Sequence, residues 1–184
     1  MKQLLTIMMT AAILSACGDT SKPKPMAGDL YPPEYTSVSN LPFNVELNSR
    51  AVHQIVDSQK EYRTISIAYP DYGAEGRISI VMVDSARLIP TFSRHLVMME
   101  LRADSVRDID EVRRNSGAIT RWVFTHPGGR EQLQWLATDS LTMYVAGSIH
   151  FEAAKDSTVD ITPALANIKA DILHLVDNLY PEGK

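Results

Sequence analysis

Histidines, carboxylates and glycine-containing turns are the parts of this chain that could do chemistry. The five histidines are spread along the sequence, and no two of them have the spacing of a metal-binding pair. Carboxylates are plentiful, but their spacing singles out no pair of a general acid and a general base. The histidines are His53, His95, His126, His150 and His174. The sequence therefore predicts no catalytic residue, no metal site and no cofactor.

Two glycine motifs could be mistaken for catalytic loops. Gly128 and Gly129 follow His126-Pro127, and the surrounding residues match neither the G-x-x-x-x-G-K-[ST] nor the G-x-G-x-x-G phosphate-binding pattern. They predict a hairpin turn between two strands. Ser148 follows Gly147 but lacks the second glycine of a nucleophile elbow. We therefore expect a protein that is not an enzyme.

The single cysteine, Cys17, ends a secretory signal. Lys2 provides the positive start, residues 4–14 form an apolar run, and Leu14-Ser15-Ala16-Cys17 fits the bacterial lipobox. The apolar run is far shorter than the ~20 residues of a membrane-spanning helix. We expect cleavage after residue 16 and acylation of Cys17, which would anchor the chain to a membrane.

Composition narrows the class of protein further. The chain is 45% hydrophobic and 22% charged, which is enough apolar material for a core. Its net charge of −4 argues against a nucleic-acid partner. No acidic cluster follows Cys17, which favours a domain facing the periplasm and leaves the choice between inner and outer membrane open.

The mature chain is predicted to have two parts. Residues 17–42 are rich in proline, which favours an extended, semi-rigid tether. Tyr31 and Tyr35 interrupt this tether and could either pin it onto the domain or bind a partner. Residues 43–184 are expected to form a single domain of ordinary size.

The domain is predicted to be α+β, with a mainly antiparallel sheet of about five to seven strands and two helices packed on it. Alternating apolar residues, or short apolar runs between turns, indicate the strands. They span residues 43–47, 62–69, 77–83, 119–125, 132–137 and 142–151, and the mixed-charge stretch 105–115 is expected at an edge.

Two apolar stripes at helical spacing indicate the helices. The first contains Leu88, Phe92, Leu96 and Met99 and can be capped by Asp84 or Ser85, although Pro90 predicts that its regular part begins near Ile89. The second begins at Thr162. Its apolar stripe is Leu165, Ile168, Ile172, Val176 and Leu179, and its polar face is Lys169, Asp171, Asp177 and Asn178.

Short motifs in a fixed order also point to a known family. They are the lipobox, Pro23-Lys24-Pro25, Gly28, Pro32, Tyr35, Leu41-Pro42-Phe43, Tyr69-Pro70, His95, Ala103-Asp104, Gly128-Gly129, Thr138-Asp139-Ser140, Gly147-Ser148, Asp156-Ser157, Pro163, Asp171-Ile172 and His174-Leu175. In this order they resemble the GldD gliding-motility lipoproteins of the Bacteroidetes. Asp29, Leu30 and His150 depart from the family pattern.

The resemblance implies an accessory part of the gliding and type IX secretion apparatus that contacts other envelope proteins. It implies no catalytic residues. Two alternatives remain open. One is a periplasmic module that binds a small ligand or a lipid between the layers. The other is a hydrolase, which would need His95, His126, His150 or His174 to meet an acid in one cleft.

Overall fold

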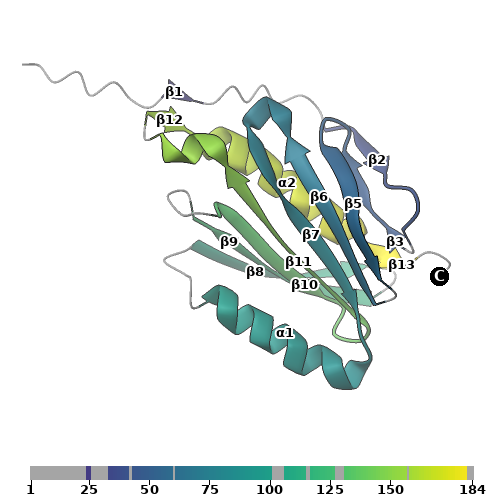
Figure 1. Ribbon diagram of the computed structural model, residues 1–184. Coiled ribbons are helices and arrows are strands. Elements are labelled where there is room, and N and C mark those ends of the chain that lie inside the picture. The colour runs from purple at the N-terminus through teal and green to yellow at the C-terminus, as the bar shows by residue number, and fades with distance from the viewer. Residues whose placement is uncertain are drawn as a thin grey trace, which may run out of the picture.

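A sheet in which every neighbouring pair of strands is antiparallel forms the centre of the fold (Figure 1). The computed structural model describes residues 24–25, 33–41, 43–59, 61–100, 106–114, 117–126, 131–156 and 158–181. In spatial order the seven strands are β5 (Val52–Gln59), β6 (Tyr62–Tyr69), β7 (Ala74–Met82), β11 (Met143–Phe151), β10 (Leu133–Thr138), β9 (Gly117–Thr125) and β8 (Val106–Arg114). The predicted α+β class is confirmed.

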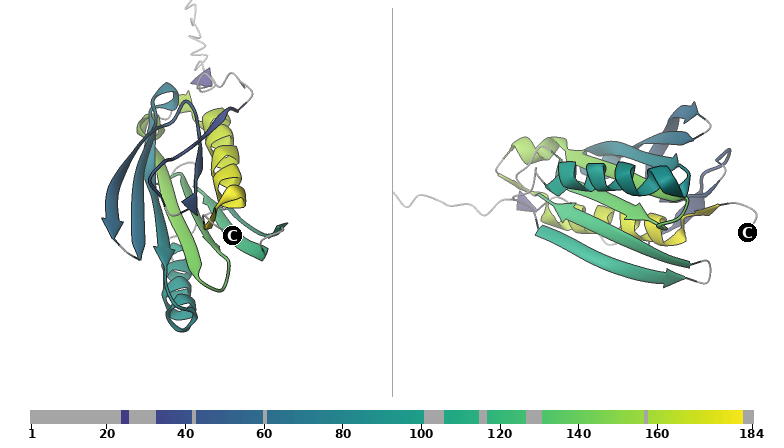
Figure 2. Two further views of the ribbon diagram at one scale, coloured as in Figure 1. Left: turned by 90° about the vertical axis from the view of Figure 1, so that its right-hand side faces the viewer. Right: turned by 90° about the horizontal axis from the view of Figure 1, so that it is seen from below.

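The two long helices, α1 (Ser85–Glu100) and α2 (Thr162–Asn178), pack on opposite faces of the sheet (Figures 1 and 2). Leu88, Phe92 and Met99 of α1 contact side chains of β9, β10 and β11. The apolar side of α2 packs on the other face, where it meets alternate residues of the strands, such as Ile65 and Ile67 of β6. The sheet is therefore the middle of three layers.

The beginning of α1 differs from the prediction. The helix begins at Ser85, one turn before Ile89, with Pro90 inside it. Asp84 caps the helix, because its carboxylate accepts a hydrogen bond of 3.0 Å from the backbone nitrogen of Arg87 and one of 2.8 Å from the guanidinium of that residue. This cap stabilises the first turn, which therefore lies N-terminal to Pro90.

Short strand pairs bind the N-terminal part of the chain to the domain. β1 (Lys24–Pro25) pairs in parallel with β12 (Val159–Asp160), and β2 (Tyr35–Ser37) pairs antiparallel with β4 (Glu46–Asn48). β3 (Phe43–Asn44) pairs with β13 (Tyr180–Pro181), and two short 3-10 helices, η1 (Pro70–Tyr72) and η2 (Glu152–Lys155), follow β6 and β11. Both β1 and β2 lie in the range that the sequence predicted as tether. The division at residue 43 stays a prediction.

Two features of the domain were missed in the sequence. β5 was not predicted, because seven of its eight residues are polar or exposed and it forms an edge of the sheet with a bulge between Ile55 and Asp57. Asp171 was assigned to the solvent-facing side of α2. That assignment is wrong, since Asp171 is only 8% exposed.

Gly147 allows the largest core side chain to lie flat against β11. Trp135 of β10 pairs directly with Gly147 and is 1% exposed. A Cβ at residue 147 would lie 2.0 Å from the Cζ2 atom of Trp135, far inside van der Waals contact. Glycine is therefore required at this position by packing rather than by backbone conformation.

Replacement of Gly147 by alanine is expected to lower the free energy of unfolding by about 1–3 kcal/mol, because the buried indole has to move. Chemical denaturation followed by tryptophan fluorescence measures this change. Ser66→Ala, on the opposite and less buried face of the sheet, is a control that should change it by less than about 0.5 kcal/mol. Equal stabilities of Gly147→Ala and the native protein would contradict the packing argument.

Candidate functional site

Five polar residues from three elements meet where the N-terminal segment crosses α2. They are Tyr35 of β2, Glu46 and Asn48 of β4, and Asp171 and His174 of α2. We call this group the tether cluster. Asp171 and His174 are three residues apart on the helix, so both point toward the same two strands. The pairing of β2 with β4 brings Tyr35 directly opposite Asn48.

Asp171 is the buried centre of the tether cluster. Its Oδ1 accepts a hydrogen bond of 3.1 Å from the Tyr35 hydroxyl, and the Asn48 amide donates to Oδ1 at 3.1 Å and to Oδ2 at 3.0 Å. Burial raises the pKa of this carboxyl above its ordinary value, while the hydrogen bonds from Asn48 and Tyr35 and the nearby His174 oppose the rise. The donors therefore make it possible to bury an acidic group inside the domain.

Tyr35 is held by stacking as well as by its hydroxyl. Its ring lies parallel to the imidazole of His174, with ring centroids 3.5 Å apart and planes 9° apart. The Nε2 atom of His174 lies 2.8 Å from the Glu46 carboxylate, which holds the imidazole from the side of β4. Burial and the Asp171 charge raise the pKa of Tyr35 to about 12, so its hydroxyl stays a donor at neutral pH.

Two further tyrosines border the tether cluster. Tyr69 is 3% exposed, and its hydroxyl has no hydrogen-bond partner among the described residues. Burial and the charge of Asp171 both raise the pKa of Tyr69. The ring of Tyr72 lies 6.5 Å from that of Tyr69, and its hydroxyl accepts a hydrogen bond of 3.1 Å from Asn167 on α2. Polar groups are thus inserted at the margin of the apolar contact between β6 and α2.

The chemistry of the tether cluster is that of attachment. Across the described part of the chain, no three His, Cys, Asp or Glu residues are arranged to hold a metal ion. His174 lies on the α2 side of the sheet, whereas His95 of α1 and His150 of β11 lie on the other side, where His150 contacts Glu75 at 3.1 Å. The described histidines are therefore spread over both faces of the sheet, although His174 contacts Glu46 and His95 lines one groove together with Glu131.

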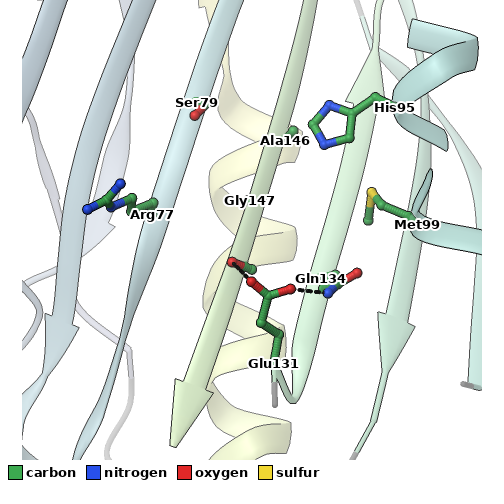
Figure 3. Close-up of a pocket in the computed structure, with 9 residues that line it drawn as sticks. Arg77, Ser79, His95, Met99, Glu131, Gln134, Ala146 and Gly147 are labelled. Carbon is green, nitrogen blue, oxygen red and sulfur yellow. Dashed lines mark hydrogen bonds between the residues drawn. The ribbon is translucent and has the colours of Figure 1, made fainter. Parts of the chain in front are cut away.

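A polar groove of about 190 Å³ opens on the α1 side of the sheet. Its floor and walls are Arg77, Ser79, His95, Met99, Glu131, Gln134, Ala146, Gly147 and Ser148. Figure 3 shows His95 and Met99 reaching over the strands from α1, while the Arg77 guanidinium points away from the groove. The Glu131 carboxylate accepts hydrogen bonds from the Gln134 amide and, at 3.3 Å, from Ser148.

Gln134 contributes an unsatisfied acceptor to the groove. Its side-chain nitrogen donates to Glu131, which fixes the orientation of the amide and leaves Oε1 on the opposite side. This oxygen is buried and has no partner among the described residues, although Gln134 is only 5% exposed. A buried carbonyl without a donor is costly, but an added group could donate to this oxygen only after neighbouring side chains move, because the atom is almost inaccessible.

The sheet face beside this groove is not covered by α1. The cluster under α1 draws on β9, β10 and β11 and, at its margin, Val81 and Val83, but on no side chain of β5 or β6. Residues directly opposite one another share a face of the sheet, so the register gives the composition of the open part. It consists of Val52, Gln54, Asp57, Gln59, Tyr62, Thr64, Ser66, Ala68, Glu75, Arg77 and Ser79. Most side chains of this open face are polar, but Val52 is apolar and 61% exposed, and Thr64 is only 5% exposed.

The residues singled out in the sequence are only partly placed by the structure. Tyr35 is half-buried in the tether cluster, whereas Cys17 and Tyr31 lie outside the described residues. Asp171 could have been found from spacing, because Ala164, Ile168 and Leu175 lie on the same helical stripe and are all buried. No comparable periodic pattern in the sequence indicates the roles of Asn48 and Gln134. Their roles follow from strand pairing across large sequence distances.

Replacement of Asn48 by alanine is expected to raise the pKa of Asp171 further, because two hydrogen bonds to the charged carboxylate are lost. Titration of the aspartate carboxyl carbons by NMR measures this shift. Gln54→Ala on the open face is the control variant. Asp139, whose pKa is lowered by hydrogen bonds within its own turn, should titrate alike in all three proteins. An unchanged or lower pKa of Asp171 would contradict the assignment of Asn48.

The same shift predicts how Asp171 affects stability. An acid whose folded-state pKa is raised loses its proton first in the unfolded chain, so its contribution to stability is lost as pH rises from about 4 through the folded-state pKa. The free energy of unfolding of the native protein minus that of Asp171→Asn should therefore decrease as pH rises over this range. A difference that does not vary with pH would contradict the raised pKa.

Comparison with known proteins places the chain in a family. A family model described as gliding motility lipoprotein GldD matches residues 18–180, which is most of the chain. A search of curated proteins finds no match. No helix among the described residues combines the length and the apolar character needed to cross a bilayer. Tyr35, Tyr69, Asp171 and His174, which carry part of the resemblance seen in the sequence, lie in or beside the tether cluster. The chain belongs to the GldD family of gliding motility lipoproteins.

Proposed function

We propose that this lipoprotein is an accessory component of the gliding-motility and type IX secretion machinery. It acts by binding other envelope proteins and not by catalysis. The observation that carries the proposal is the family match over residues 18–180.

Lipid on Cys17 is the proposed anchor. Cleavage after residue 16 would make Cys17 the first residue of the mature chain, and acyl chains attached there would hold the protein at the membrane. The domain is proposed to face the periplasm. The lipoprotein character of the family supports the anchor, and the lipobox supplies the position.

The open face of the sheet is the proposed contact surface for partner proteins. It is largely polar and adjoins the groove through Arg77 and Ser79. Polar surfaces of this kind suit contacts between proteins that also exist apart, because they remain soluble when they are free. We also propose Tyr31, in the tether, as a second contact with partner proteins. Tyr35 contributes through the attachment of the tether, since its ring and hydroxyl already engage α2.

A second candidate function is the binding of a small polar ligand in the groove. The unpartnered Oε1 atom of Gln134 favours it. A lipid ligand is disfavoured, because the groove is lined mostly by polar and charged side chains and its volume of about 190 Å³ is below the several hundred Å³ of common ligand pockets. This candidate and the protein-contact proposal make different predictions for the same labelled position.

A photoreactive residue at position 79, on the groove side of β7, is expected to crosslink envelope proteins of the motility or secretion machinery in intact cells. Ser79 is small and lies where the groove meets the open face. Ala170, exposed on the outer side of α2, is the control position and should capture these proteins much less. Mass spectrometry of the captured species gives the readout.

The outcomes separate the two functions. Machinery proteins captured at position 79 and not at position 170 would support the proposed contact surface. A small mass added to the lipoprotein itself at position 79 would favour the ligand-binding alternative. Equal capture at both positions would contradict a contact at the open face.

A further inference from the structure

The N-terminal segment is attached to the domain at two places on one side. β1 pairs with β12, immediately before α2 begins, and β2 pairs with β4, where the tether cluster fixes Tyr35 to α2. Figure 1 shows β1 and β12 together at one end of the sheet, and Figure 2 shows the same two strands side by side. The β1–β12 pair is the attachment nearer in sequence to Cys17, the proposed site of the lipid.

Covalent geometry limits how far this attachment can be from the membrane. Seven Cα–Cα steps separate Cys17 from Lys24, so the two residues can be no more than about 25 Å apart even when the chain is fully extended. If Tyr35 were the first attached residue, eighteen steps would allow about 65 Å. The pairing of β1 with β12 therefore shortens the maximum reach more than twofold.

The β12 end of the domain lies at one end of the long strands. β11 runs from Met143 to Phe151 and leads directly into η2, while Leu141 in the preceding turn lies at the other end. Nine residues of strand span about 30 Å. Glu152 and Leu141 thus mark the near and far ends of the domain.

We infer that the lipid anchor holds the domain with its β12 end, which comprises η2, β12 and the first turn of α2, facing the lipid headgroups. The inference rests on the proposed acylation of Cys17. The far end, with Leu141, points away from the membrane. The long strands run from the near end to the far end, so the open face is turned sideways, toward proteins in the same membrane.

The charges at the near end agree with a domain whose position is set by the length of the tether and not by electrostatic attraction to the lipid headgroups. Asp156 and Asp160 both lie there, and each is engaged by a neighbouring threonine, Thr158 or Thr162. No group of lysines or arginines is found among the described residues of η2, β12 and the first turn of α2, where Lys155 stands among carboxylates. A basic cluster would be needed to draw this end onto anionic lipids. The tether length therefore sets the separation.

Energy transfer to the membrane tests this orientation. The full-length lipoprotein, purified with its lipid and reconstituted in phosphatidylcholine vesicles that carry an acceptor dye on a headgroup, is labelled at Glu152→Cys or at Leu141→Cys. Acylated Cys17 does not react with the label. Because the two sites are separated by about 30 Å of strand, transfer from position 152 should exceed transfer from position 141 by about twofold or more. Equal transfer, or greater transfer from position 141, would overturn the inference.

One insertion placed at two sites provides the control. Ten glycine and serine residues between Thr20 and Ser21 lengthen the chain before β1 and should sharply reduce transfer from position 152. The same insertion between Gly28 and Asp29 lies after β1 and should leave transfer unchanged. Equal reduction by both insertions would show that β1 does not hold the domain, and the inference would be wrong. Vesicle flotation tests the anchor separately, since a protein that does not float lacks the proposed lipid.

Discussion

A carboxylate that is almost completely buried requires hydrogen-bond donors, and Asp171 obtains them from residues 123 and 136 positions away in the chain. Asp171 of α2 takes its donors from β4 and β2, and in turn it adds a hydrogen bond to the strand pairing and ring stacking that hold β2. The contacts of Tyr35 thus join β2 directly to α2.

The two faces of the sheet differ in what covers them. Its α2 side is apolar except at the tether cluster, and it connects the domain to the segment that leads to the proposed anchor. Its other side is covered by α1 over β9, β10 and β11 and is open over β5 and β6. Gly147 contributes to both sides. Its missing Cβ makes room for Trp135 in the core on the α2 side, and Gly147 itself lines the groove on the other side together with Ser148. The attachment of the N-terminal segment and the proposed contact surface thus lie on opposite faces of one sheet.

Local pattern in the sequence was sufficient for the elements that bury one face. Alternation of Ile65, Ile67 and Tyr69 predicted β6, and the apolar stripe of α2 predicted its packing. The pattern failed for β5, which buries little on either face, and for Asp171, whose charge suggested solvent. The tether cluster and the groove could not be predicted, because each depends on strand register between distant segments. Strand register is a property of the assembled sheet.

The edge strand β5 has a consequence for a protein confined to a surface. Val52 and Val56 are 61% and 50% exposed, and an edge with unpaired backbone groups can add a strand from another copy. Copies held on one membrane meet more often than the same number in free solution, so this risk of self-association rises with anchoring. The bulge between Ile55 and Asp57 interrupts the regular row of backbone donors and acceptors, and the Asp57 carboxylate adds charge beside it. β5 is thereby made a poor template for polymerisation in a crowded envelope.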